Sequence, residues 1–474
     1  MKSKKINGFW VWLFSVFILF VLCSNLITAG IVRHALLDGN SLTKQQREFA
    51  LNFSAIPSNI RYALRLVLGY EDSTLLLKKE STEKASWTRS FPSPQDNGYL
   101  LLSGAIQPNA ESGVQLIRIS DGKILAEWRP NWEEISAKTP DGKNFRKKGN
   151  PKYLRAMHPL LLDNGDVIFN STGGSMVRLN LCESSPTWVT TDVHHHSTEL
   201  DIDGQTIWSP SVSPDPAFHN DWLNNNLRDD SISRISLDGK TIENRSFSKI
   251  LINNGLTALL LGHSGNTLNN DPIHMNQISV APTSGPYWDK GDLLISSRHL
   301  STVFLYRPST DKIIWYQSGP WMNQHAAKFV DRQKISIFDN NLFAGAPHSA
   351  PFLEKDDINR IFIYDFSKKE ASEPYKALLE KTKPATITEG LARVLDDGGL
   401  FLEESNYGRH LRFTKDKLLW SRVNDYDDKR IGVLSWSRYL TQEEAQAPLK
   451  AIAGRLSANP SCSNASLQQS ESPH

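Results

Sequence analysis

Hydrophobic residues fall into two kinds of run along this chain. An uncharged stretch from Ile6 to Val32 has a core, Phe9 to Ile27, that is dense in Phe, Trp, Leu, Val and Ile. From about residue 88 onward, short apolar runs alternate with DG, NG and similar turn signals. The first kind of run predicts a helix, and the second predicts short strands joined by tight turns. The pattern therefore indicates an all-β domain behind a separate N-terminal segment.

The N-terminal segment is long enough to cross a hydrocarbon layer of about 30 Å as a helix. Lys2, Lys4 and Lys5 precede it, which predicts a single-pass anchor with the N-terminus in the cytoplasm. A cleaved signal peptide is the alternative, although the run is long for one and no small-residue cleavage motif closes it tightly. Either interpretation places the bulk of the chain in the periplasm or an equivalent space, where Cys182 and Cys462 could be oxidised.

Six segments after residue 88 share one form: a turn, two strands, another turn, and a strand that often ends in Trp. They begin near residues 96, 163, 202, 290, 332 and 396. Repeated small antiparallel sheets predict a six-bladed β-propeller, with seven blades or a β-sandwich array as alternatives. The recurring Trp is expected to pack between blades. We expect a cytoplasmic tip and anchor over 1–40, a helical connector over 41–84, the propeller over 85–436 and a C-terminal tail over 437–474.

Composition and charge narrow the classes of function. The 474 residues are 39% hydrophobic and 22% charged, which is ordinary for a globular protein. The net charge of +2 combines +3 in residues 1–40, from four basic residues and one acidic residue, with −1 in the remainder. A near-neutral body argues against a nucleic-acid partner. Three cysteines without a CxxC pair argue against a cysteine zinc site.

Histidines recur just before the first turn of a repeat unit. In a propeller the strand that precedes this turn is the innermost one, so equivalent side chains point toward one central axis. We therefore expect convergence at one mouth of the central channel for four histidines: His158, His196, His274 and His325.

Arg298 lies in the strand ISSRH of the unit that His274 precedes, and no carboxylate is close to it in sequence. An anionic ligand would supply the missing counter-charge, while a remote acid such as Glu404 is the alternative. Imidazoles around an anion can donate hydrogen bonds, transfer protons or attack as nucleophiles. His196, His274 and His325 could instead hold a metal, although no acidic residue behind them is evident from the sequence.

Five motifs carry a resemblance to a known family: HHHSTELDIDG (194–204), DPIHMNQI (271–278), GDLLISSRHLSTVFLYRP (291–308), QHAAKFVDRQKISIFDN (324–340) and EESNYGRHLRFTKDKLLW (403–420). With them the chain resembles the bacterial arylsulfate sulfotransferases over roughly residues 150–435, most strongly over 271–340. The resemblance implies a six-bladed propeller outside the cytoplasm. It also implies sulfuryl transfer from an aryl sulfate donor to a hydroxyl acceptor through a sulfohistidine, without a nucleotide sulfate donor, a metal or another cofactor.

The resemblance also implies roles for single residues. His325 matches the nucleophile, and His274 and Arg298 match the groups that hold the sulfate oxygens. The upstream histidine would be His196, or less readily His195. Further substrate contacts are expected from His195, His158, Asn276 and His299. Two other functions stay open: a non-catalytic propeller that binds an anionic ligand or a protein, and a metal-dependent hydrolase that uses the same histidines.

Overall fold

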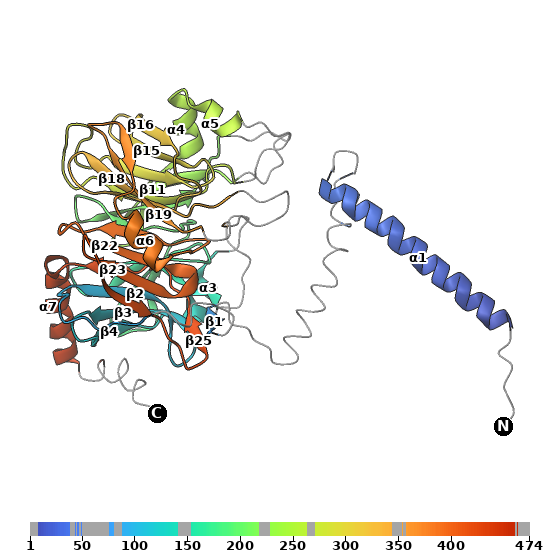
Figure 1. Cartoon of the computed structure of the whole chain (residues 1–474), viewed down its shortest axis with the longest axis horizontal. Coiled ribbons are helices and arrows are strands. Elements are labelled where there is room, and N and C mark those ends of the chain that lie inside the picture. The colour runs from blue at the N-terminus through green and yellow to red at the C-terminus, as the bar shows by residue number, and fades with distance from the viewer. Residues whose placement is uncertain are drawn as a thin grey trace. The chain divides into compact units, whose positions relative to one another are not determined.

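Strand pairing organises the chain after residue 72 into six four-stranded antiparallel sheets and one two-stranded sheet. The computed structural model describes residues 8–37, 43, 45–46, 49, 75–79, 88–140, 153–217, 228–262, 271–343, 353, 357–459 and 462. The six sheets are the blades of a β-propeller (Figure 1), which confirms the predicted fold class and blade number.

Blades 2 to 6 are each continuous in the chain, and strand order in the sheet follows order in the sequence. Blades 2 and 3 consist of β5 (Ala156–Leu161), β6 (Val167–Ser171), β7 (Met176–Leu179) and β8 (Pro186–Val189), and of β9 (Glu199–Leu200), β10 (Thr206–Val212), β11 (Asp230–Ser236) and β12 (Thr241–Ser246). Blade 4 consists of β13 (Met275–Val280), β14 (Leu293–Ser297), β15 (Thr302–Arg307) and β16 (Lys312–Ser318). Blades 5 and 6 consist of β17 (Ala326–Phe329), β18 (Lys334–Asp339), β19 (Arg360–Asp365) and β20 (Glu370–Ser372), and of β21 (Leu391–Val394), β22 (Leu400–Glu404), β23 (Arg409–Phe413) and β24 (Leu418–Val423).

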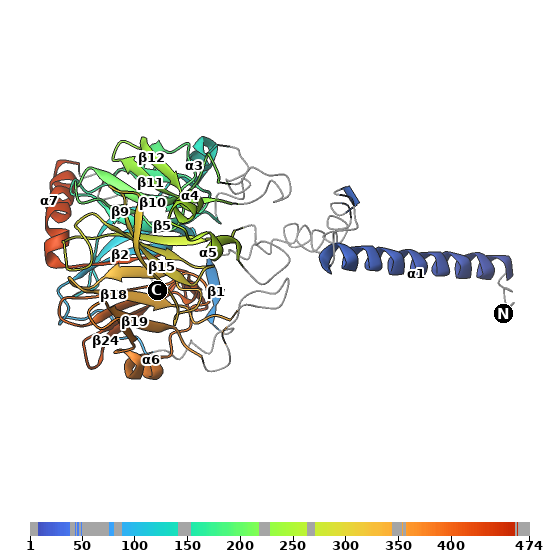
Figure 2. The same ribbon diagram turned by 90° about the horizontal axis from the view of Figure 1, so that it is seen from above.

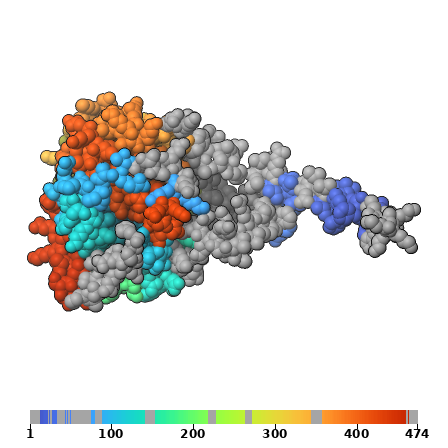
Figure 3. Space-filling view, turned by 60° about the horizontal axis from the view of Figure 1, so that its bottom comes forward, coloured from blue at the N-terminus to red at the C-terminus, as the bar shows by residue number. Residues whose placement is uncertain are grey.

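Blade 1 joins the two ends of the propeller. Its outer strands are β2 (Tyr99–Ile106), β3 (Glu111–Arg118) and β4 (Ile124–Trp128), and its first strand is the C-terminal β26 (Arg438–Leu440). β26 pairs antiparallel with β2, with Leu440 opposite Tyr99. Figure 3 shows the two ends side by side on the surface, in light blue and red. The propeller therefore extends past the predicted boundary at residue 436.

The two-stranded sheet pairs β1 (Leu76–Lys78) with β25 (Arg430–Gly432). β1 lies inside the segment 41–84, so the prediction of a helix is wrong for these three residues. Residues 50–74 of the predicted helical connector lie outside the described residues.

The N-terminal unit contains one long helix, α1 (Gly8–Leu37). Among the described residues, no helix combines the length and the apolarity that crossing a membrane requires. The predicted membrane anchor is therefore not confirmed.

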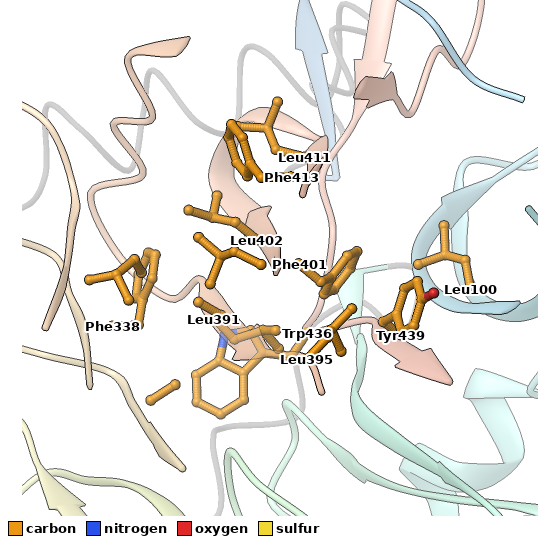
Figure 4. Close-up of a cluster of buried hydrophobic side chains, with 14 of the residues drawn as sticks. Leu100, Phe338, Leu391, Leu395, Phe401, Leu402, Leu411, Phe413, Trp436 and Tyr439 are labelled. Carbon is orange, nitrogen blue, oxygen red and sulfur yellow. The ribbon is translucent and has the colours of Figure 1, made fainter. Parts of the chain in front are cut away.

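Blades pack face to face, so both faces of their middle strands are covered. β14 (LLISS) and β22 (LFLEE) are buried along their whole length, which is why each begins with three consecutive apolar residues rather than an alternating pattern. Trp128 at the end of β4 packs with Val167 and Phe169 of blade 2, as predicted for the recurring Trp. Another cluster joins blades 5, 6 and 1, and in Figure 4 it includes Phe338 and Trp436.

The connections between strands contain short helices: α3 (Trp132–Lys138), α4 (Phe247–Asn253), α5 (Thr257–Leu261), α6 (Lys376–Thr382) and the 3₁₀ turn η6 (Ser405–Tyr407). The longer α7 (Gln442–Ala458) follows β26 and begins with a capping box between Thr441 and Glu444. Ile452 of α7 packs into the cluster between blades 1 and 2, and Cys462 forms a disulfide with Cys182. In Figures 1 and 2, α7 and β1 lie at opposite ends of the propeller.

Candidate functional site

The same backbone conformation recurs at the beginning of the first strand of every blade. One residue there has a positive φ, between 48° and 66°: His158, His196, His274, Asn323, Glu389 and Trp436. This left-handed conformation is unfavourable for most side chains but tolerated by Asn and His. The first strands of blades 3 to 6 contact one another around the centre. The repeat therefore places three predicted histidines equivalently, whereas His325 lies two residues after its blade's left-handed residue.

The imidazoles from blades 3 and 4 form a contiguous cluster. The ring centroid of His196 lies 5.0 Å from that of His195 and 5.4 Å from that of His274. His274 in turn lies 4.3 Å from His299. Two of the four histidines that the repeat predicts to converge, His196 and His274, therefore meet in one cluster, and His195 and His299 adjoin them.

Trp436 from the closing segment of blade 1 adjoins this cluster. Its ring centroid lies 5.8 Å from His196, 6.2 Å from His325 and 5.5 Å from His158. Trp436 is fully buried, so its apolar surface excludes water beside the imidazoles. Nothing in the sequence repeat pointed to this residue, because it lies past the sixth unit.

Arg298 is a buried cation without a carboxylate partner among the described residues. Only 7% of it is exposed, and its Nε has no hydrogen-bond partner there. Its Nη1 donates to His299 Nε2 at 2.9 Å. Burial lowers the pKa of Arg298, and the more distant Asp271 partly offsets this effect. The alternative partner Glu404 is instead bonded to Arg409, so that interpretation is wrong.

Asp271 supports the two histidines of blade 4. His274 Nδ1–H donates to its carboxylate Oδ2 at 2.5 Å, and His299 Nδ1–H donates to its backbone carbonyl. The sequence interpretation that no acid stands behind the histidines is therefore wrong. Asp271 is three residues before His274 in the motif DPIH. That spacing was the sequence feature from which an acidic partner of His274 could have been predicted.

A metal site would use a different set from the one predicted. Within the described part of the chain, the histidine and acidic ligand atoms close enough to share an ion belong to Asp271, His274 and His299, all within 4.8 Å of one another. His196 and His325 are not in this group. The Arg298 guanidinium adjoins His299, and a fixed cation there opposes a second one.

His325 is buried, and both of its ring nitrogens are engaged. Nδ1–H donates to Asn340 Oδ1 at 2.5 Å, and Nε2 accepts the backbone N–H of Glu389 at 3.0 Å. The amide of Asn340 cannot be reversed, because its Nδ2 donates to the carbonyls of Thr386 and Glu389. Burial, with a further contribution from Arg298, holds the pKa of His325 well below its ordinary value. His325 is therefore neutral at pH 7, with its Nε2 lone pair directed at a backbone amide.

Two predicted binding residues lie outside the cluster. His158 Nδ1 accepts the backbone N–H of Thr198 at 3.2 Å and contacts Arg438. It belongs to a buried ionic network centred on Glu199, which pairs with Lys328 and Arg438. Asn276 donates to the carbonyl of Gln324 at 3.2 Å and so joins blade 4 to the residue before His325. Both side chains hold the blades together.

Comparison with known proteins adds the family. A family model described as arylsulfotransferase (ASST) matches residues 158–424, which include the whole cluster up to His325. No curated protein matches the chain. Among solved structures, a protein of unknown function from Bacteroides caccae aligns at 11% identity and a TM-score of 0.43, over 73% of this chain and 99% of that one. A structure of U3-55K aligns at 8% identity and a TM-score of 0.34, over 62% of this chain and 73% of that one.

Proposed function

Because this chain belongs to the arylsulfotransferase (ASST) family, we propose that it moves a sulfuryl group from a phenolic sulfate ester to a phenolic or other hydroxyl acceptor, without a nucleotide sulfate donor. Arg298 is the observation that carries the proposal. A buried guanidinium whose Nε has no hydrogen-bond partner among the described residues, and which lies beside imidazoles, lacks the counter-charge that burial demands. The sulfate ester of the donor would supply that charge through the guanidinium fork.

The proposed reaction has two half-reactions. His325 Nε2 attacks sulfur, the S–O bond of the donor breaks, and the phenolate leaves. The acceptor oxygen then attacks the same sulfur, the N–S bond breaks, and His325 is restored. One difficult transfer is thereby divided into two easier ones. Attack requires the Nε2 lone pair to be released from the Glu389 N–H.

Arg298 and His274 would stabilise charge on the sulfuryl oxygens. His274 Nδ1–H is committed to Asp271, so its Nε2 donates to an oxygen only when the ring is protonated. The Asp271 carboxylate stabilises such an imidazolium. Removing one preorganised donor from the oxyanion hole of an acyl-transfer enzyme costs about 3–4 kcal/mol of transition-state stabilisation.

We also propose that the reaction takes place outside the cytoplasm. The disulfide between Cys182 and Cys462 supports this location, because such bonds persist in oxidising compartments.

The test is to locate the sulfuryl group. Full-length protein is treated with 4-nitrophenyl sulfate, quenched and mapped by peptide mass spectrometry. We expect one sulfuryl group on His325 and none in the His325→Ala variant, which should also lose transfer. An adduct on His196 or His274, whose Nε2 atoms have no partner among the described residues, would reassign the nucleophile while leaving the reaction intact. Absence of both adduct and transfer would refute the proposed function.

A second candidate is a non-catalytic propeller that binds a sulfated ligand. The Glu389 N–H on His325 Nε2 favours it, because a blocked lone pair cannot attack. This candidate predicts Arg298-dependent binding of 4-nitrophenyl sulfate, measured by calorimetry, without release of 4-nitrophenol.

A further inference from the structure

Two imidazoles of the cluster and a carboxylate behind them form a line of close polar contacts. His196 Nδ1 lies 2.8 Å from His195 Nδ1. The other nitrogen of His195, Nε2, lies 3.4 Å from Asp230 Oδ1 and 3.3 Å from the carbonyl oxygen of Ser211. Asp230 is fully buried. The line therefore runs from a buried carboxylate through one imidazole to a second imidazole at the cluster.

The partners of each atom determine where the protons are. Both neighbours of His195 Nε2 are acceptors, so this nitrogen carries a hydrogen. Burial lowers the pKa of His195 and, together with neighbouring imidazoles, that of His196, so both rings are neutral at pH 7. The Nδ1 of neutral His195 is then an acceptor, and it accepts the Nδ1–H of His196. The Nε2 of His196 is left as a bare lone pair, with no partner among the described residues.

The carboxylate at the end of the line is held in its ionised form. Arg228 Nε donates to Asp230 Oδ1 at 2.9 Å, and the backbone N–H of Met275 donates to its Oδ2. Burial alone would raise the pKa of Asp230, but Arg228 and His195 lower it below its ordinary value. A negative charge therefore stands beside His195 and stabilises an imidazolium there. Among the described residues, the other titratable groups that act on the two rings are His274 and His325.

We propose that Asp230, His195 and His196 form a proton relay that deprotonates the hydroxyl acceptor; this inference rests on the sulfuryl transfer proposed above. His196 is the base that contacts the acceptor, and His195 and Asp230 are positioning residues that act through it. Neither Asp230 nor the direction of the relay follows from the sequence motifs.

The proton steps balance within the site. As the acceptor oxygen bonds to sulfur and the N–S bond of the sulfohistidine breaks, the hydroxyl proton moves to His196 Nε2. The Nδ1 proton of His196 moves to His195 Nδ1, so the positive charge comes to rest beside the Asp230 carboxylate. In the next donor half-reaction the same proton returns along the line and protonates the departing phenolate. Between half-reactions the relay thus holds one extra proton on His195. This position is one ring further from Arg298 than His196 is.

His274 cannot take this part equally well. Its Nδ1–H ends directly on Asp271, and a protonated His274 is needed where the sulfuryl oxygens bind. His196 passes its charge on to His195 and remains neutral. His196 and His274 therefore have different roles, although their ring centroids lie only 5.4 Å apart.

The test compares acceptors that need a base with acceptors that do not. Full-length protein is charged with 4-methylumbelliferyl sulfate at pH 8 and offered phenol, which is mostly protonated because phenolic groups titrate at about 10, or pentafluorophenol, which is already ionised. In His195→Gln and Asp230→Asn we expect transfer to phenol to fall roughly 10- to 100-fold, a usual range for lost general-base assistance. Transfer to pentafluorophenol should change less than about twofold, because no base is needed.

The ratio of the two rates cancels any loss of folded protein, so poor folding of a variant does not obscure the result. His410→Gln is the matched control, since His410 is also a buried histidine paired with a carboxylate, that of Glu403. It should leave the ratio unchanged. An equal fall for both acceptors in the relay variants would overturn the relay. Failure of the unmodified protein to transfer to either acceptor would instead contradict the proposed function.

Discussion

Sulfuryl transfer and non-catalytic binding of a sulfated ligand make the same prediction about Arg298: each requires it to bind a sulfate group. Inorganic sulfate should bind its free donors and raise the melting temperature of the full-length protein, because a ligand bound only to the folded state adds about 2.7 kcal/mol of stability at 100 times its Kd. Arg298→Gln should remove this shift. Arg298→Lys should restore only part of it, since an ammonium lacks the guanidinium fork.

Differential scanning fluorimetry across a sulfate series measures the effect. Sulfate also stabilises proteins by exclusion from their surface, so the exposed Arg332 supplies the control variant Arg332→Gln. Only the part of the shift that Arg298→Gln removes and Arg332→Gln retains belongs to the site. An undiminished shift in Arg298→Gln would show that no anion binds at this guanidinium.

At the same scale, some side chains could be predicted from the sequence and others could not. The positions of His196 and His274 were predictable because a repeat converts sequence position into position around an axis. Arg298 was predictable because no carboxylate lies close to it in the sequence. His158 occupies the predicted place, yet its Nδ1 accepts a hydrogen bond from the backbone N–H of Thr198. The spacing of the histidines does not predict that partner. Asp230 was unpredictable for a related reason: it lies at the start of β11, the third strand of blade 3, and its side-chain contact with the imidazoles is made through His195.

Among the elements, the segment that leads into β26 depends on one buried carboxylate. Glu403 of β22 accepts the backbone N–H groups of Trp436 and Ser437 at 2.8 and 2.6 Å. Glu403→Gln leaves the shape but removes the charge, and breaking a buried charged network costs about 3 kcal/mol. We expect a loss of about that size in the free energy of unfolding at pH 7, measured by urea denaturation. The exposed Glu370→Gln should change it by less than about 0.5 kcal/mol.

The contribution of Glu403 should also depend on pH with a definite sign. Burial alone would raise the pKa of Glu403, but hydrogen bonds from His410, Ser405 and Ser437 lower it below its ordinary value of 4.5. A carboxyl group with a depressed pKa stabilises the fold above its unfolded pKa and loses that effect as pH falls. The difference between the natural protein and Glu403→Gln should therefore be full at pH 7 and shrink below pH 4.5. A difference that stays constant down to pH 3 would contradict this role.

The strands themselves were largely predictable, since the six units seen in the sequence contain the outer strands of the six blades, apart from the short β20 that follows the fifth unit. Their first strands were harder to place because some are very short, such as β9 with two residues, and left-handed residues interrupt the pattern before them. β1 and β26 could not be predicted as strands, because three residues are too few to show the alternation of apolar and polar residues that marks a strand. Both gain their hydrogen bonds from partners more than 300 residues away.

At the scale of the whole molecule, the ring is closed twice. β26 completes blade 1 by hydrogen bonds, and the disulfide then fixes the chain after α7 to Cys182, following blade 2's third strand. The covalent loop spans 280 residues and includes blades 3 to 6. Long loops gain the most from a cross-link because the unfolded chain loses the most freedom, which makes a disulfide worth about 2–5 kcal/mol.

Reduction should therefore destabilise the entire propeller rather than α7 alone, since opening α7 also exposes the cluster between blades 1 and 2 that contains Ile452. Thermal unfolding of the full-length protein with and without dithiothreitol measures this. Cys462→Ser should unfold at the lower temperature in both conditions, because its bond is already absent. Cys23→Ser removes a cysteine that forms no disulfide, so it should respond to reductant as the natural protein does. If reduction releases α7 to proteolysis but leaves the main unfolding transition in place, the disulfide secures only the helix, and β26 alone closes the ring.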